Sequence, residues 1–371
     1  MRLWLVSLLI LFSFIGCNES KPEIKASGEV VHIGIIFAND DALMHKRLQI
    51  FELFQKHWGL LKNGDQLTLH AVSAEGEALS CFNKLIKKEK LAVVISFLDS
   101  TTMLDLKESI EKNKIPVISV IATHSKINDI KYVSRICLNN PWQANVAAAY
   151  IRDELFIANI DVITDEKNDF SVELSNLFKE RYTKIGGNVI TTIASSILKD
   201  DPEAFVKQMN ENKINALFST IDAGQTKRLL QVLQRVDHEV KILAHDGLLS
   251  AFKTKFPKDV SLLNGILVID NYADNVKILK KGKNLRHYKL DKNEHFLDSY
   301  NGLSYDSWSL MKQALNACKT YESECLNDYM RNTASVEGIV ETFRMENGNA
   351  LRAVYVNKIE HKKMKVQVKV Y

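Results

Sequence analysis

Short apolar runs alternate with amphipathic segments along most of the chain. The apolar runs lie at 31–37, 67–72, 92–97, 116–121 and 132–136, and again at 160–164, 188–193, 216–219, 240–244 and 265–269. The amphipathic segments predict helices at 43–58, 75–89, 102–113, 140–156, 171–184, 201–212 and 224–235. Strands separated by helices of this length are typical of parallel sheets with right-handed crossovers. The pattern therefore predicts an α/β protein with two doubly wound lobes and a boundary near 150–158.

The C-terminal part of the chain departs from this alternation. Helical patterns at 294–317 and 323–332 precede strand patterns at 339–344, 353–359 and 364–370. The first two strands are separated by Glu346-Asn347-Gly348-Asn349, a hairpin signal. We expect the chain to return to the first lobe and then cross back. The first lobe is then 31–150 plus about 275–336, and the second is 151–274 plus about 337–371.

The N-terminal segment has the pattern of an export signal. The apolar run from Leu3 to Ile15 is shorter than the ~17–25 residues of a membrane-spanning helix, and it has the length of a signal-peptide core. It ends in Gly16-Cys17, which resembles the lipobox of bacterial lipoproteins, whose cysteine is lipidated and becomes the mature N-terminus. We expect a signal peptide at 1–16 and a lipidated tether at 17–30, which would anchor the protein to a membrane outside the cytoplasm. The alternative is an ordinary secretory signal with a coincidental cysteine.

Composition narrows the function classes further. The 371 residues include 46% hydrophobic and 25% charged residues, as in ordinary globular proteins, and the net charge of +4 is too weak to indicate a nucleic-acid partner. The sequence has no Gly-x-Ser-x-Gly elbow, His-Glu-x-x-His motif or Gly-rich phosphate loop, so an exported enzyme is disfavoured. It has no Cys-x-x-Cys pair either, and we expect neither a metal site nor a cofactor.

The cysteines suggest one disulfide. Cys318 and Cys325 lie seven residues apart in a polar stretch between two helical patterns, and export permits disulfides. We expect this pair to be bonded, with a stabilisation of about 2.5 kcal/mol in the entropic description of such a loop. For Cys81 and Cys137, the pattern leaves pairing and two buried thiols equally open.

Polar residues that follow strands are the candidates for a binding site. In open parallel sheets, ligands bind outside the carboxyl ends of the strands. Asp99-Ser100-Thr101-Thr102 follows the third strand and opens a helix, where backbone N–H groups and hydroxyls suit an anion. Thr123 follows the fourth strand, and Asp222 follows the strand at 216–219. We expect these residues at the cleft side of the two sheets.

Several segments together resemble one family. They are LAVVISFLDSTT, IPVISVIAT, SRICLNNPWQANVAAAYI, NDFSVELSNLFKERYTKIGGNVI, ILAHDGLLS, LSYDSWSLMKQAL and ETFRMENGNALRAVYVNKIE. In order and spacing they resemble the type 1 periplasmic binding proteins, in particular the leucine/isoleucine/valine-binding group of ABC-transporter substrate-binding proteins, over nearly all of residues 31–371. The resemblance implies two lobes joined by three crossovers, with a ligand between them and no catalysis.

The resemblance also implies roles for individual residues. Residues at the positions of Ser100, Ile121 and Thr123 hold an amino-acid carboxylate in the family, and an acid at the position of Asp246 pairs with the ammonium group. The alternatives are a helix cap for Ser100, a turn residue for Thr123 and a solvated turn for Asp246.

Two aromatic positions of the family cleft fall at Phe170 and Tyr300, and either residue could equally belong to the core. The loop at 38–42 and the stretch after Asp165 depart from the family pattern, so a branched-chain ligand does not follow from the resemblance.

The resulting hypothesis is an extracytoplasmic lipoprotein that binds a small polar ligand. An amino acid is the expected ligand class, and an ABC permease in the membrane is the expected partner. The alternative function is a ligand-sensing or envelope-assembly lipoprotein of the same fold without transport. Saturable amino-acid binding would separate the two.

Overall fold

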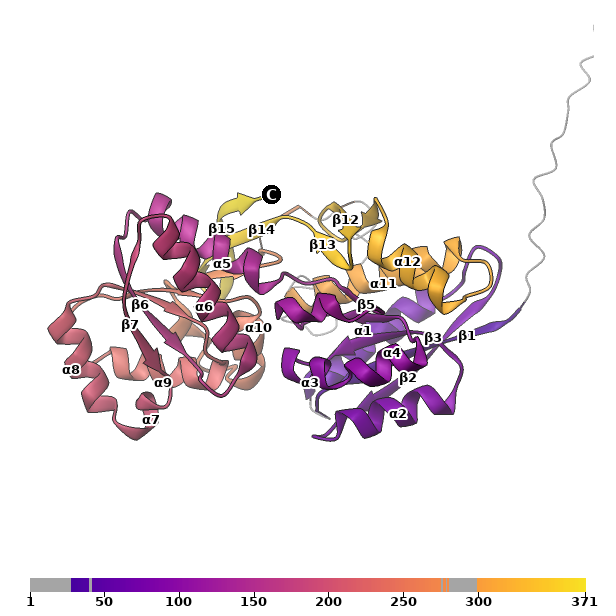
Figure 1. Cartoon of the computed structure of the whole chain (residues 1–371), viewed down its shortest axis with the longest axis horizontal. Helices are drawn as coiled ribbons and strands as arrows, with labels where there is room; N and C mark the ends of the chain where they lie inside the picture. The colour runs from indigo at the N-terminus through magenta and orange to yellow at the C-terminus, as the bar shows by residue number, and fades with distance from the viewer. Residues whose placement is uncertain (1–27, 40–41, 275, 278, 280–298) are drawn as a thin grey trace, which may run out of the picture.

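Two lobes lie side by side in the computed structural model, which describes residues 28–39, 42–274, 276–277, 279 and 299–371 (Figure 1). The predicted signal peptide, Cys17, most of the tether and the start of the predicted helix at 294–317 lie outside the described residues. Within the described residues, no helix combines the length and the apolar character needed to cross a bilayer.

The first lobe is built on an eight-stranded sheet in the order β11-β12-β13-β5-β4-β3-β1-β2. Its strands are β1 Val30–Phe37, β2 Gln66–Ser73, β3 Leu91–Phe97, β4 Val117–Ser119, β5 Val133–Arg135, β11 Val336–Glu337, β12 Thr342–Glu346 and β13 Asn349–Leu351. Its helices are α1 Ala42–Trp58, α2 Ala78–Lys88, α3 Ser100–Asp105, α4 Lys107–Asn113, α11 Ser299–Ala317 and α12 Ser323–Asn332, with a 3₁₀ turn at Ser125–Asp129. The strands from β1 to β5 pair in parallel, as predicted.

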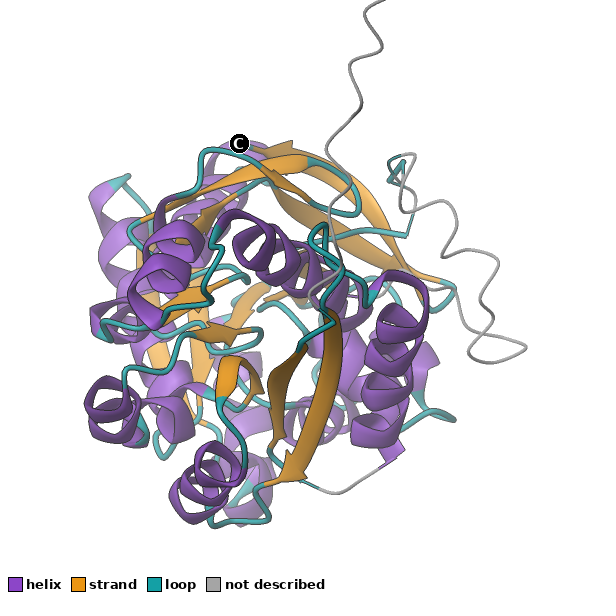
Figure 2. Cartoon of the chain, turned by 90° about the vertical axis from the view of Figure 1, so that its right-hand side faces the viewer, coloured by secondary structure: helices purple, strands orange, loops and turns teal. Residues whose placement is uncertain are grey.

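Alternation along these strands divides the first lobe into two cores. Ile33 and Ile35 pack with α1, α11 and α12, whereas Ile36 of the same strand faces α2, α3 and α4. Successive side chains of a strand point to opposite faces, so an unbroken apolar run is the expected pattern for a sheet covered on both sides. Figure 2 shows the helices on both sides of the strands.

The second lobe is built on a seven-stranded sheet in the order β15-β14-β10-β9-β8-β6-β7. Its strands are β6 Asn159–Thr164, β7 Asn188–Ala194, β8 Ala216–Ser219, β9 Lys241–Ala244, β10 Leu267–Asp270, β14 Val354–Glu360 and β15 Lys363–Val370. Its helices are α5 Asn140–Ala149, α6 Asp169–Lys184, α7 Ile197–Asp200, α8 Pro202–Asn212, α9 Ala223–Leu233 and α10 Leu248–Lys255, with a π turn at Tyr150–Glu154 and a 3₁₀ turn at Val260–Leu263. The strand pattern did not predict α10. The predicted helix at 102–113 is divided at Leu106 into α3 and α4.

The first crossover comes earlier than the predicted boundary at 150–158. Helix α5 was expected in the first lobe, but Val146 and Ala147 share a core with Val162 and Phe178 of the second lobe. The chain therefore crosses between β5 and α5. The sequence pattern indicates that α5 has an apolar face, but it does not indicate which sheet that face covers.

The third crossover comes later than predicted. The turn at Asn347-Gly348, where both residues have positive φ, joins β12 to the short strand β13 rather than to β14. Strand β13 pairs with β5, and Phe343 of β12 enters the core of the first lobe. Residues 336–351 therefore belong to the first lobe, and the prediction that 337–371 all lie in the second lobe was wrong. The chain crosses at Arg352 and Ala353, above the junction of the lobes in Figure 1.

A buried ion pair lies where these connections meet. Nη1 of Arg352 donates to Oδ2 of Asp306 in α11 at 2.8 Å, and both side chains are almost fully buried. The hydroxyl of Tyr272, just after β10, also donates to Asp306. The carboxylate of Asp306 thus connects α11 with the segment that follows β10 and with the third crossover.

A disulfide joins Cys318 to Cys325, the pair predicted from the spacing. It ties the C-terminal end of α11 to the first turn of α12. Cys137 is a buried thiol and Cys81 a partly buried one, and neither forms a disulfide.

Candidate functional site

A cavity of about 160 Å³ lies between the lobes, at the carboxyl ends of strands from both sheets. The lining residues are Asp99, Ser100, Thr101, Ile121 and Thr123 of the first lobe, Asn168, Phe170, His245, Asp246 and Gly247 of the second, and Ser299, Tyr300 and Leu303 of α11. The predicted residues Ser100, Ile121, Thr123, Phe170, Asp246 and Tyr300 are all among them. The structure thus brings together six of the seven predicted ligand-binding residues.

The wall of the first lobe presents hydroxyl groups. Asp99, rather than Ser100, caps α3, because its carboxylate accepts from the backbone N–H of Thr102 at 2.8 Å. Oγ of Ser100 instead accepts from the backbone N–H groups of Thr123 and His124 at 3.1 and 3.2 Å. Since that oxygen acts as an acceptor, its hydrogen can be donated to a ligand.

Thr123 is held in place by its backbone and has its hydroxyl in the cavity wall. Its carbonyl accepts from Nη1 of the buried Arg135 at 3.2 Å and from the backbone N–H of Asn140 at 2.8 Å. Its Oγ1 is buried and has no hydrogen-bond partner among the described residues. A buried hydroxyl normally has a partner, so this atom is suited to a ligand oxygen.

The wall of the second lobe is acidic. Asp246, which lines the cavity, follows β9, and Asp270 is the last residue of the neighbouring strand β10. Burial raises the pKa of Asp246 to about 7, and the side-chain amides of Gln143 and Asn271 only partly offset this effect. Burial, followed by the charge of Asp246, also raises the pKa of Asp270. The two carboxyls therefore form a site that a cation would stabilise.

Gly247 allows this wall to approach α11 closely. Its φ is +72°, and a Cβ at this position would lie 3.0 Å from the hydroxyl of Tyr300. Its N–H donates to Oδ2 of Asp270 at 3.2 Å, and Oγ of Ser299 donates to the same carboxyl group. Asp270 therefore fixes both the turn after β9 and the start of α11.

Aromatic rings border the cavity from both lobes. The ring of Phe170 lies edge-on to that of His245, with centroids 5.0 Å apart. The guanidinium of Arg47 lies over the ring of Tyr300, 4.1 Å from its centroid. Both rings contact other side chains and the cavity, so packing and lining the cleft are not exclusive roles.

The lobes also contact each other at the rim of the cavity. Glu173 of α6 accepts from the backbone N–H of Ser125 of the first lobe, at 3.0 Å to Oε2, and is also held within the second lobe by Nδ2 of Asn140 at 2.7 Å. Oγ1 of Thr101 donates to Asp169 at 3.2 Å. These polar contacts join the first lobe to the N-terminal turns of α6.

Asp222 is the predicted ligand residue that the structure places outside this cavity. Its carboxylate caps α9 by accepting from the backbone N–H of Gln225 at 2.8 Å, while Oε1 of Gln225 accepts from the N–H of Asp222 at 3.0 Å. The acid does follow a strand, as predicted, but this reciprocal capping box turns its side chain to the helix end.

The sequence analysis missed Asp270, His245 and Gln143. Asp270 follows a predicted strand just as Asp246 does, and that position was the available signal. Gln143 accepts from the backbone N–H of Asp246 at 3.1 Å, across 103 residues of sequence, which no local pattern could indicate. In the described part of the chain, no group of three or more His, Cys, Asp or Glu side chains is arranged to hold a metal ion.

Comparisons with known proteins agree with this arrangement. A family model described as periplasmic binding protein matches residues 72–364. No curated protein sequence gives a significant match.

Solved structures of the same fold cover nearly the whole chain. The leucine-binding protein LivK of Thermotoga maritima has 21% identity and a TM-score of 0.80, with 92% of this chain and 98% of that chain covered. The branched-chain amino acid transporter substrate-binding protein LivJ of Streptococcus pneumoniae, in complex with isoleucine, has 18% identity and a TM-score of 0.78, with 92% and 100% covered. An ABC-transporter solute-binding protein of Rhodopseudomonas palustris, in complex with 3,4-dihydroxybenzoic acid, has 17% identity and a TM-score of 0.75, with 92% and 97% covered.

Proposed function

Because the chain belongs to the periplasmic binding protein family, we propose that it captures a small zwitterion, an amino acid, between its lobes and delivers it to the permease of an ABC transporter. The family consists of binding proteins, in agreement with the prediction that the chain is not an enzyme. The observation that carries the proposal is the contrast between the two cavity walls. Hydroxyl donors line the wall of the first lobe, and an acidic wall faces them.

This contrast matches the two ends of an amino acid. A ligand carboxylate would accept from the hydroxyls of Ser100 and Thr123, and Ile121 would pack beside it. The ligand ammonium would face Asp246, with Asp270 behind it, and would restore the ionised form that burial disfavours. Charge-assisted hydrogen bonds of this kind are about twice as strong as neutral ones.

The acidic wall also discriminates between the ligands of the structural relatives. The Streptococcus protein holds isoleucine, which carries an ammonium group, whereas the Rhodopseudomonas protein holds an aromatic acid. An acid without a cationic group would meet Asp246 and Asp270 without compensation.

Closure of the lobes would complete the site. Phe170 and Tyr300 approach the cavity from different lobes and would cover the bound ligand. A ligand that contacts both walls stabilises the closed form by its differential affinity, and the crossovers act as the hinge.

The test is a thermal-shift screen of the soluble domain against amino acids and small carboxylates, followed by calorimetric titration with the ligand found. Asp246→Asn keeps the shape and removes the charge, so affinity should fall ~10–150-fold. Ser100→Ala should cost about 1 kcal/mol. Asp222→Asn, the same chemical change outside the cavity, is the matched control. Unchanged affinity in Asp246→Asn would show that the ligand is not held through an ammonium group at this wall.

We further propose that the protein acts outside the cytoplasmic membrane, anchored through a lipid on Cys17. The apolar run that ends in Gly16-Cys17 supports this proposal. Cys17→Ser should yield unprocessed or soluble protein in cell fractionation. Membrane partitioning and maturation of the Ser variant like those of the wild type would exclude the anchor, and would leave the ligand proposal untouched.

A further inference from the structure

A second hollow lies on the first lobe, between the end of α1, the C-terminal half of α11, and α12. Its volume is about 690 Å³, which is within the range of small-molecule sites. Lys312 lines this hollow, and Tyr300 of the same helix lines the cleft twelve residues earlier. Closer together on the same helix, Leu303 lines the cleft and Tyr305 lines the hollow. None of the described residues lines both cavities, so the hollow is separate from the cleft.

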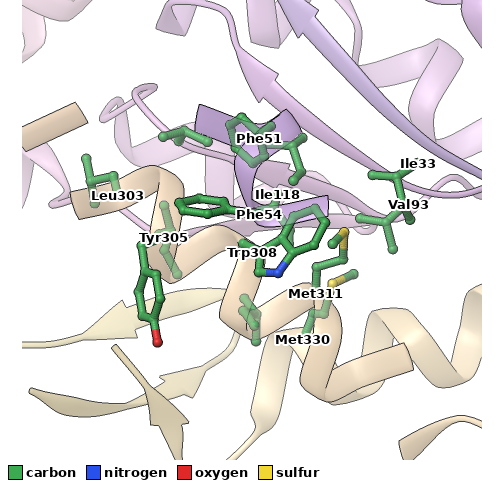
Figure 3. Close-up of a cluster of buried hydrophobic side chains, with 14 of the residues drawn as sticks. Ile33, Phe51, Phe54, Val93, Ile118, Leu303, Tyr305, Trp308, Met311 and Met330 are labelled. Carbon is green, nitrogen blue, oxygen red and sulfur yellow. The ribbon is translucent and has the colours of Figure 1, made fainter. Parts of the chain in front are cut away.

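Aromatic side chains form much of its wall. Trp58, Tyr305, Trp308 and Tyr329 line it, and the rings of Trp58 and Tyr305 meet edge to face at 6.1 Å. Trp308 packs on its inner side against Phe54, with centroids 5.8 Å apart. In Figure 3 the hydroxyl of Tyr305 points away from the labelled cluster of apolar side chains. Walls of this kind suit a flat, apolar ligand body.

The amide side chains of the hollow are already engaged by the protein. Oδ1 of Asn316 accepts from the backbone N–H of Lys62 at 2.8 Å, and its Nδ2 donates to the carbonyl of Lys312 at 2.8 Å. Gln313, with its amide oriented to suit its neighbours, donates to the carbonyl of Ser335 at 3.0 Å and accepts from the N–H of Glu337 at 3.1 Å.

One cationic side chain in the wall keeps donors to spare. Nζ of Lys312 donates one hydrogen to the carbonyl of Trp58 at 2.6 Å, which leaves two N–H groups of an ammonium. Lys312 forms no ion pair within the described ranges, and burial lowers the pKa of its ammonium group. Glu337 also lines the hollow, but an anionic acceptor placed at Lys312 would complement its remaining N–H groups and its charge.

The hollow is held together by long-range links. The disulfide between Cys318 and Cys325 ties α11 to α12 next to it. The bond from Lys62 to Asn316 ties the loop after α1 to α11 across 254 residues of sequence. A site that is largely preformed loses less free energy to ordering when a ligand binds.

We propose that this hollow is a second binding site, which takes an aromatic carboxylate with its rings between the tryptophan and tyrosine side chains and its carboxylate at Lys312. The occupant differs in charge from the zwitterion of the cleft. Its binding does not require the cleft residues.

The test is calorimetric titration of the folded protein with 1-naphthylacetate and with 1-naphthylacetamide, a neutral analogue of nearly the same shape. The carboxylate should bind at least ~10-fold more tightly than the amide, the factor that corresponds to one modest charge-assisted contact. Lys312→Met keeps the length of the side chain and should abolish this difference, whereas Lys312→Arg should retain it. Lys319→Met, at an exposed lysine beyond α11, is the matched control and should bind as the wild type does.

A variant in the cleft tests whether the two sites bind their ligands independently. Asp246→Asn should leave naphthylacetate binding unchanged. The proposal is overturned if neither probe binds, if both bind equally, if Lys312→Met binds as the wild type does, or if Asp246→Asn weakens naphthylacetate binding. None of these results bears on amino-acid binding in the cleft, which the Asp246→Asn titration with the screened ligand decides.

Discussion

The hinge and the cleft both bury aspartate carboxyls, but they surround them differently. At the hinge, Asp306 accepts from the guanidinium of Arg352 at 2.8 Å, from the backbone N–H of Ile339 at 2.7 Å and from the hydroxyl of Tyr272. In the cleft, the side chains that lower the pKa of Asp246 are neutral amides, and its charged neighbour is a second acid, Asp270. The carboxylate at the hinge has a counter-ion within the protein, whereas a bound ligand would have to supply the counter-ion of the cleft carboxyls.

This difference separates a structural charge from a binding charge. A buried ion pair contributes little relative to an apolar replacement, but removal of one partner leaves the other charge buried and uncompensated. Arg352 is further enclosed, because its guanidinium lies 4.7 Å from the ring centroid of Tyr272 and 5.1 Å from that of Phe343. An uncompensated acid in a cleft, by contrast, is a site at which a ligand can supply the missing charge.

The largest expected effect is at the hinge. Asp306→Asn should lower the free energy of unfolding by up to about 3–5 kcal/mol, because buried Arg352 would keep only Glu341, 4.0 Å from its Nε, as a counter-ion. Urea denaturation followed by circular dichroism measures this change. Asp246→Asn serves as the control and should not destabilise the protein at neutral pH. If Asp306→Asn lowers the free energy of unfolding by less than ~1 kcal/mol, the ion pair at the hinge contributes little to stability.

The next effect is a dependence of stability on pH that comes from the cleft. The pKa of Asp246 rises on folding from 3.8 to about 7, so between these pH values the folded protein holds a proton that the unfolded chain has released. The free energy of unfolding should therefore fall as the pH rises from about 4 to about 7, by on the order of 4 kcal/mol, since one pKa unit corresponds to about 1.4 kcal/mol. Thermal denaturation across this range measures it.

Two comparisons sharpen the pH prediction. Asp246→Asn should reduce the dependence, since one of the two titrating carboxyls is gone and Asp270 loses the neighbouring charge that contributes to its raised pKa. A saturating amino acid should stabilise the wild type more at pH 8 than at pH 5, because its ammonium group favours the ionised carboxyl. The assignment fails if the wild type becomes more stable than Asp246→Asn as the pH rises.

The smallest expected effect tests whether Asp222 only caps α9 or also contacts the ligand in the cleft. Asp222→Ala should lower the free energy of unfolding by about 1 kcal/mol, because the first turn of α9 loses its cap. Ligand affinity should stay at the wild-type value, as measured by the same titration used for Asp246→Asn. An affinity loss as large as that of Asp246→Asn would place Asp222 within the binding site after all.

The fold class followed from the sequence because apolar periodicity is a local property. The strand at 92–97 is apolar at every position except Ser96, so it had to be covered on both faces, and β3 is. Ser100 and Thr123 could be proposed for one site because the carboxyl ends of parallel strands meet at one edge of a sheet. Asp246 follows a strand of the other sheet, and the family resemblance placed it opposite them.

Partners distant in sequence could be decided only by the tertiary structure. Helix α5 has an apolar face that fits either sheet, and the packing against α6 assigns it to the second lobe. The strand at 342–346 turns into β13, which pairs with β5 of the first lobe, whereas β14 pairs with β10 and β15 of the second. Asp222 and Asp246 both follow strands, and only the neighbours decide between them: Gln225 draws the first to a helix end, while Gly247 and Asp270 hold the second at the cavity. The sequence by itself thus determined which segments form strands and helices and where a site could lie, since these depend on neighbours along the chain. Lobe membership, carboxylate pairing and the hollow beside α11 depend on contacts across hundreds of residues, and these exist only after the chain has folded.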